Sequence, residues 1–105
     1  HGGRQLDGAI SPMRVLRASV EALGPDYPVM IDSGFRRGSD ILKALALGAR
    51  MVFVGRPFNY AMATAGEHGV AHAIGLLRGE VDRDMAMLGV NRCGELGPQM
   101  LMRTR

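Results

Sequence analysis

The chain has 105 residues, of which 47% are hydrophobic and 22% charged, so we expect one small soluble globular domain rather than a disordered chain. It contains no run of about 18 apolar residues and no signal-peptide pattern, which predicts a cytoplasmic location. The net charge of +3 comes from twelve arginines and one lysine that are scattered rather than clustered, and aromatic residues are few, which argues against nucleic-acid binding.

The first residues and the lone cysteine indicate where the chain comes from. The chain begins with His1 rather than Met, so we expect a fragment or processed piece of a longer protein. The lone Cys93 cannot form an internal disulfide, which fits a reducing compartment. The first eight residues combine two cations, His1 and Arg4, with flexible glycines and the carboxylate of Asp7, and this density of polar groups suggests a site.

A first helix is predicted over residues 12–23. Ser11 supplies an N-cap residue and Pro12 a favourable first position, and Gly24-Pro25 ends the helix. Apolar residues at helical spacing form one stripe, which consists of Met13, Leu16, Val20 and Leu23.

Two short apolar runs, 28–31 and 51–54, are predicted to be strands. Neither run alternates with polar residues, so we expect both strands to be covered on two faces, as in a parallel sheet flanked by helices. A helix over 41–47, capped by Ser39 or Asp40 and ended by a left-handed Gly48, lies between them. The pattern predicts a βαβ unit with a right-handed crossover.

The loop 32–40 between the first strand and this helix carries the main candidate site. Free backbone N–H groups and the positive end of the helix dipole can hold an anion at the end of a strand. Arg36 and Arg37 can reach phosphate oxygens, Gly34 and Gly38 allow close approach of a ligand, and Asp32 can accept a hydroxyl. The pattern favours a phosphate-binding loop, and the alternative is a turn capped by Asp32 with solvated arginines.

The second strand ends in a similar loop, Gly55-Arg56-Pro57, which is a second candidate for phosphate binding. A short helix over 58–65 follows, Gly66 interrupts it, and a long helix is predicted over 67–88. After Gly89 the chain is expected to be irregular, with a final turn opened by Pro98. The expected apolar face of the long helix consists of Val70, Ile74, Leu77, Val81, Met85 and Leu88.

His68 and His72 lie four residues apart on the long helix and could share a metal ion. Two histidines with no third ligand nearby are more often part of a solvated face. We therefore predict no metal site.

Three separated segments, 1–7, 32–38 and 55–57, closely resemble the C-terminal part of the FMN-dependent α-hydroxy acid oxidases and dehydrogenases. Their order and spacing, together with the intervening 43–49, make the resemblance specific, and it runs the whole length of the chain. Members of that family are (β/α)8 TIM barrels, a fold of about 250 residues. The resemblance thus implies an α/β fragment, residues 1–105 of one barrel domain, comprising about β7-α7-β8-α8 preceded by α6.

The resemblance also implies the roles of individual residues. His1 matches the catalytic base and Arg4 the arginine that pairs with the substrate carboxylate. The FMN site implied by the resemblance comprises Asp32, Ser33, Gly34, Phe35 and Arg36 in the first loop and Gly55 and Arg56 in the second.

The implied activity is oxidation of an L-2-hydroxy acid to the 2-oxo acid with FMN as cofactor. Asp32-Ser33-Gly34 departs from the Asp-Gly-Gly of many oxidases and favours a bacterial dehydrogenase, with lactate or mandelate as substrate. The alternatives are another FMN- or phosphate-binding barrel enzyme and a non-catalytic module that binds phosphate or nucleic acid.

The expected partners are the small substrate, the rest of the barrel and further copies in a homo-oligomer. We expect the chain alone to be inactive and either oligomeric or prone to aggregation, because an open piece of barrel leaves strand edges unpaired. Membrane attachment of the parent protein through a segment outside this chain stays open.

Overall fold

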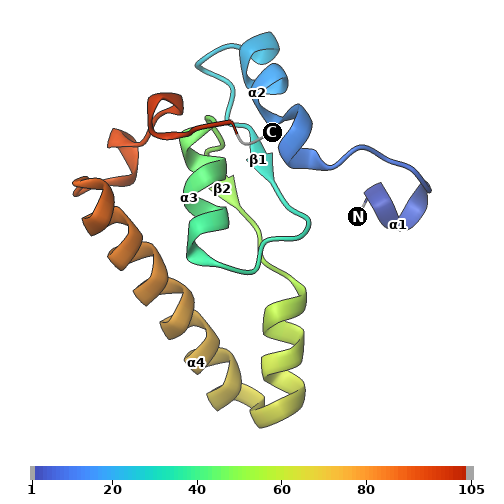
Figure 1. Ribbon diagram of the computed structural model, residues 1–105. Helices are drawn as coiled ribbons and strands as arrows, with labels where there is room; N and C mark the ends of the chain where they lie inside the picture. Colours follow the sequence, from blue (N-terminus) through green and yellow to red (C-terminus); the bar gives the residue numbers. More distant parts are fainter. Residues whose placement is uncertain (1, 104–105) are drawn as a thin grey trace.

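The computed structural model describes residues 2–103, and its elements follow the expected alternation of helices and strands (Figure 1). The predicted helix over 12–23 is confirmed to the residue. The predicted last turn at Pro98 is also present as a 3-10 turn. In chain order the elements are α1 (Gly2–Gln5), α2 (Pro12–Leu23), β1 (Met30–Ile31), α3 (Gly38–Ala46), β2 (Met51–Val52), α4 (Arg56–Leu88) and the 3-10 turns Cys93–Glu95 and Pro98–Met100.

The strands β1 and β2 form a parallel pair, which confirms the expected strand–helix–strand arrangement. Ile31 lies opposite Val52, and the amide of Phe53 donates to the carbonyl of Ile31 at 2.8 Å. The strands are shorter than the predicted 28–31 and 51–54. Each has one partner strand among the described residues, so there is little ladder to extend them.

The prediction that both faces of the strands are covered is wrong for the part of the chain that the structure describes. Ile31 and Val52 face the core, whereas the neighbouring pair Met30 and Met51 is 56% and 51% exposed on the other face. Side chains alternate between faces along a strand, so helices packed on one face leave the other open. The apolar runs therefore include side chains on a face of the sheet that residues 2–103 leave uncovered.

The main core joins α2 and α3 to the covered face of the sheet. Leu16 of α2, Ile31 of β1 and Ala44 of α3 are all buried there. Leu23 of the predicted stripe is 51% exposed, because it lies in the last turn of α2. The main core therefore orients the loops that leave the two strands.

Helix α3 begins earlier than predicted. Its N-cap residue is Arg37, so the expectation that Ser39 or Asp40 occupies the N-cap position is wrong. The predicted C-terminal glycine is confirmed: Gly48 has φ 101° and donates its N–H to the carbonyl of Leu45 at 2.9 Å.

Helix α4 consists of two arms that meet at a sharp kink (Figure 1). Ala65 and Gly66 have non-helical dihedral angles, and Gly66 has φ 56°, which confirms the predicted interruption. A side chain at Gly69 would clash with the carbonyl oxygen of Ala61, so a glycine is required where the two arms touch. The first arm begins at Arg56, two residues before the predicted start.

A second core cluster fixes the end of α4 against α3 and the final turns. Its buried members are Leu42, Met85 and Val90. The predicted apolar face of α4 is confirmed in part, since Ile74 and Leu88 are 53% and 46% exposed. This packing brings the second arm of α4 alongside α3, where it reaches the candidate site.

Candidate functional site

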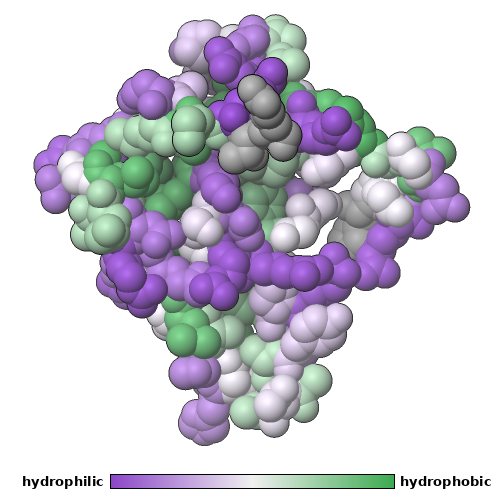
Figure 2. Space-filling view, viewed as in Figure 1, coloured by the Kyte–Doolittle hydropathy of each residue, from purple (hydrophilic) through white to green (hydrophobic). Residues whose placement is uncertain are grey.

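The two loops that sequence patterns single out leave the sheet at the same edge. Because β1 and β2 are parallel and in register, the chain exits both strands in one direction, at residues 32 and 53. Figure 2 shows a hydrophilic band across the molecule at the level of the β1–α3 loop and the start of α4. This edge, formed by residues 32–37 and 55–56, is called the carboxyl edge below.

The β1–α3 loop turns through two residues with left-handed backbone conformation. Ser33 has φ 80° and Gly34 has φ 88°, and both are exposed. Asp32 is half-buried, and its Oδ1 accepts a hydrogen bond from the Ser33 hydroxyl at 3.2 Å. The tip of the loop therefore presents backbone and a hydroxyl rather than apolar side chains.

Phe35 anchors the loop from its middle. The sequence assigned this residue to the cofactor loop, but its side chain is 4% exposed and packs in the main core with Leu16 and Ala44. Only its backbone is available to a ligand. The next residue, Arg36, is exposed.

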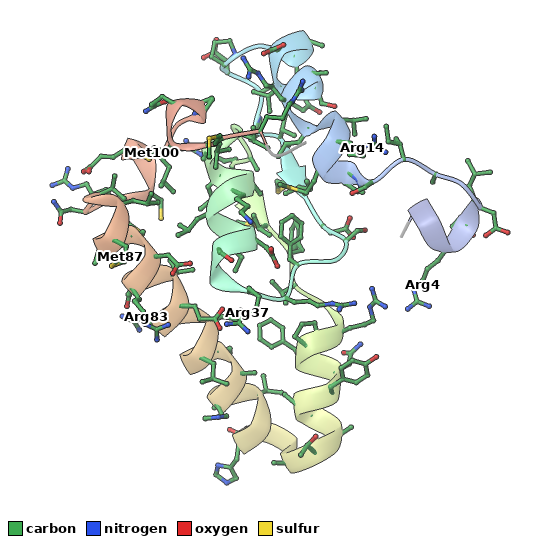
Figure 3. All side chains as sticks on the ribbon, in the orientation of Figure 1. Arg4, Arg14, Arg37, Arg83, Met87 and Met100 are labelled. Atoms are coloured by element: carbon green, nitrogen blue, oxygen red, sulfur yellow. The ribbon has the colours of Figure 1, made fainter. Side chains whose placement is uncertain are left out.

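The arginine doublet is divided between two environments. Arg37 turns to α4, where its Nη2 lies 3.0 Å from Oε1 of Glu80, and Figure 3 shows it between the start of α3 and the second arm of α4. The other oxygen of the same carboxylate, Oε2, accepts the backbone N–H of Gly38 at 2.7 Å. Arg37 is therefore engaged by α4, whereas Arg36, the other member of the doublet, is exposed.

Three backbone N–H groups at the start of α3, those of residues 36–38, donate to carboxylates of the protein. Oδ2 of Asp40 accepts the backbone N–H groups of Arg36 and Arg37 at 3.2 and 3.1 Å. Together with Glu80 it takes three of the donors that the sequence left free for an anion. The expectation that these N–H groups are free is therefore wrong, whereas anion binding by the loop stays a prediction.

The start of α4 is different. Gly55 and Arg56 are exposed, no acidic residue lies in the first turn, and no side chain caps the helix. A Cβ added to Gly55 would have no atom within 4 Å, so the space beside it is open. A basic side chain, an uncompensated helix end and open space make this junction receptive to an anion.

Of the two predicted substrate-side residues, Arg4 lies apart from these loops (Figure 3). Arg4 is exposed on α1, a short helix that the sequence did not predict and that Figure 1 shows apart from the rest of the fold. Figure 3 shows its side chain extending away from α1. His1 lies outside the described residues, so its position relative to Arg4 stays a prediction.

Other candidate features do not add to the site. His68 and His72 are exposed on α4, and no three potential metal ligands gather among residues 2–103. Two apolar hollows border α4, one beside β2 and one beside Met100, and neither is lined by the carboxyl-edge residues. No helix within 2–103 is both long and apolar enough to cross a membrane.

Sequence patterns missed Glu80. It lies 42 residues from Gly38, and nothing local indicates the contact. A weak signal was present, because Glu80, three residues after Leu77, lies at the border of the predicted apolar face of α4. A carboxylate in such a position is expected to have a specific partner.

Comparison with known proteins gives relatives over nearly the whole chain. (S)-Mandelate dehydrogenase of Pseudomonas putida is 54% identical over 101 residues, covering 96% of this chain and 25% of its own. L-lactate dehydrogenase (cytochrome) of Wickerhamomyces anomalus is 46% identical over 106 residues, covering 96% of this chain and 18% of its own.

Solved structures give the same picture. An oxidized active mutant of (S)-mandelate dehydrogenase superposes with a TM-score of 0.93 at 53% identity, over 99% of this chain and 29% of that one. A flavocytochrome b2 variant with sulfite bound superposes with a TM-score of 0.90 at 45% identity, over 95% of this chain and 27% of that one. This chain therefore spans about a quarter of the length of these relatives.

The family of FMN-dependent dehydrogenases matches residues 1–103. That match includes all three segments on which the resemblance rests. The chain therefore belongs to the FMN-dependent dehydrogenase family.

Proposed function

We propose that this chain supplies the FMN-phosphate loops and the substrate-binding N-terminal segment of an enzyme that oxidises an L-2-hydroxy acid, lactate or mandelate, to the 2-oxo acid. The observation that carries the proposal is the carboxyl edge, where two parallel strands deliver the loops 32–36 and 55–56 to one place. Ligands of parallel α/β folds bind at this end of the strands. Relatives named as mandelate and lactate dehydrogenases support the choice of substrate.

The chemistry of the carboxyl edge fits the phosphate of FMN. Arg36 and Arg56 are exposed and can form charge-assisted hydrogen bonds with phosphate oxygens. The start of α4 adds the backbone N–H groups of Gly55 and Arg56, since Pro57 has none and Phe58 donates to the carbonyl of Gly55. Gly34 and Gly55 leave room for close approach. Asp32 would hold a hydroxyl of the cofactor rather than its phosphate, since two anions repel.

At the substrate, Arg4 would pair with the carboxylate as a planar fork and so orient the hydroxyl-bearing carbon. His1 would act as the base and accept a proton from the substrate hydroxyl or from the α-carbon. FMN, when bound, supplies the acceptor for the two electrons that leave the substrate. The arginines at the phosphate position the cofactor and take no part in bond breaking.

The proposal includes the rest of a (β/α)8 barrel, of which this chain would form α6-β7-α7-β8-α8. The open face of the sheet supports it, since Met30, Met51 and Phe53 are each more than half exposed and need apolar cover. The remaining strands would provide that cover. We expect the isolated chain to be inactive and the complete enzyme to be a homo-oligomer.

The test uses the full-length protein and two variants. His1→Ala should lower turnover of lactate or mandelate by roughly 10²–10⁴-fold, because a positioned base is lost, while bound FMN stays at the wild-type level. Arg4→Lys should raise KM, because a point charge replaces a fork, again with full FMN content. His68→Ala, a change at an exposed histidine of α4, serves as the control.

The same experiment separates the alternatives. A wild-type protein without flavin absorbance would contradict the assignment of the cofactor. A flavoprotein whose Arg4→Lys and His1→Ala forms keep normal KM and turnover would instead be a barrel enzyme with different chemistry.

A further inference from the structure

We propose that Glu80, on the second arm of α4, is a positioning residue for the FMN-phosphate loop: it holds Arg37 and the start of α3, so that of the two adjacent arginines only Arg36 faces the phosphate. The inference rests on the proposed function, since it concerns how this chain prepares the FMN site. Glu80 itself would not touch the cofactor.

The contacts of Glu80 connect two elements that are distant in sequence. Its Oε2 accepts the N–H of Gly38 at 2.7 Å, and its Oε1 lies 3.0 Å from Nη2 of Arg37. One carboxylate thus binds both the backbone at the first residue of α3 and the side chain just before it. The β1–α3 loop is thereby fixed at its far end, as pairing of β1 fixes its beginning and Phe35 fixes its middle.

The packing around Glu80 leaves little freedom for this end of the loop. Its side chain is 21% exposed, whereas that of Arg37 is 71% exposed. A Cβ added to Gly38 would lie 2.6 Å from the Cβ of Glu80 and 2.7 Å from the N of Val81. Gly38 therefore allows α3 to begin directly against the backbone of α4, and the hydrogen bond sets the register of that contact.

The charges at the start of α3 also favour this role. Arg37 and Glu80 form an ion pair, so the carboxylate does not stand near the phosphate loop as an uncompensated negative charge. Asp40 in turn compensates the end of α3 by accepting the N–H groups of Arg36 and Arg37. Exposed Arg36 is left with its positive charge for an incoming anion.

A merely structural role for Glu80 makes a different prediction from a positioning role. If Glu80 only stabilised the packing of α3 on α4, its loss would weaken binding of any flavin to the same extent. If it positions the phosphate loop, its loss should weaken FMN and spare riboflavin, which has the same ring and ribityl chain but no phosphate.

The experiment titrates the full-length apoprotein with FMN and with riboflavin and follows flavin fluorescence. Glu80→Ala should weaken FMN binding on the order of tenfold and change riboflavin binding less than about twofold, because both contacts of the carboxylate to the end of the loop are lost. Glu80→Gln keeps an acceptor for Gly38 and should weaken FMN binding by less. Glu67→Ala and Glu67→Gln, at an exposed glutamate of the same helix, are the matched controls and should behave as wild type.

A second variant keeps the test decisive if Glu80→Ala does not fold. Arg37→Gln changes an exposed side chain and should weaken FMN binding several-fold, because Glu80 is left unpaired beside the loop. In a Glu80→Gln background the same change should have no further effect, since both act through one contact. Independent, additive losses would contradict the pairing.

Three results would overturn the inference. Unchanged FMN affinity in folded Glu80→Ala protein, or an equal loss for riboflavin, contradicts the positioning role alone and leaves the proposed function standing. A wild-type apoprotein that does not distinguish FMN from riboflavin removes the phosphate site itself, and with it both proposals.

Discussion

The two strand–helix junctions at the carboxyl edge have similar sequences but opposite electrostatic states. At the β1–α3 junction, Asp40 and Glu80 already occupy the backbone donors at the helix start. At the β2–α4 junction, no acidic side chain lies in the first turn and Arg56 is exposed. A glycine followed by an arginine therefore does not by itself determine whether the start of the helix is free to bind an anion.

The difference suggests a division of labour between the junctions. The β1–α3 junction is held in shape before any ligand arrives, and a preformed loop loses little conformational entropy on binding. The β2–α4 junction carries the unbalanced positive charge that attracts an anion. Shape thus comes from one loop and the main electrostatic attraction from the other, and the predictions below test that assignment.

The largest effect is expected at Arg56. Arg56→Met in the full-length protein should weaken FMN binding on the order of 100-fold, because the guanidinium at the open helix start is lost, and should leave riboflavin binding unchanged. Arg37→Met, the same change at the compensated junction, should cost less, since Arg37 pairs with Glu80 rather than with the phosphate. Titration of the apoproteins with both flavins measures the difference.

Arg83→Met, at an exposed position on the second arm of α4, is the control. Equal losses of FMN affinity in the Arg37 and Arg56 variants would show that the two junctions contribute alike. The comparison on which the division of labour rests would then be wrong.

The sequence predicted much of this fold because the informative signals are local. Ser11-Pro12 and Gly24-Pro25 bound α2, and Gly66 interrupts α4, since each acts through its own backbone. The parallel strands followed from two apolar runs with a helix between them. The place of the candidate loops at one edge followed from that topology.

What could not be predicted depends on contacts between distant residues. The ion pair of Arg37 with Glu80 separates the arginine doublet, and no local pattern distinguishes Arg36 from Arg37. Phe35 was assigned to the cofactor loop, yet whether its ring faces ligand or core is decided by α2 and α3. The prediction that both faces of the strands are covered was wrong for the same reason. A continuous apolar run does not indicate which residues will cover it.

The second prediction compares the glycines at the two junctions. Gly38→Ala should lower the free energy of unfolding by about 1–3 kcal/mol, because the new Cβ would meet the backbone of Val81, which cannot move aside as a side chain would. Gly55→Ala has no atom within 4 Å of the new Cβ, so it should mainly lower FMN affinity by filling space that the ligand needs. Thermal unfolding of the apoproteins and FMN titration measure the two effects.

Gly75→Ala, in the second arm of α4 with open space around the new Cβ, is the control and should be neutral or stabilising. If Gly38→Ala kept wild-type stability, the close contact between α3 and α4 would be absent in solution. Glu80 would then lose its basis as a positioning residue.

The smallest effect is expected at the tip of the first loop, where Ser33 adopts φ 80°. A non-glycine residue in this conformation costs roughly 1–2 kcal/mol, which a glycine would relieve. A glycine also raises the entropy of the unfolded chain, and this offsets roughly 0.4–1 kcal/mol of the gain. Ser33→Gly should therefore stabilise the full-length apoprotein by about 0.5 kcal/mol, a rise in Tm of roughly 0.5–1 °C. Ser39→Gly, in the first turn of α3, lacks this relief and should lower Tm instead. A fall in Tm for both variants would mean that the strain at Ser33 is smaller than the loss of its hydrogen bond to Asp32 and the added chain entropy together, so the preformed shape of the loop would come from its three anchors alone.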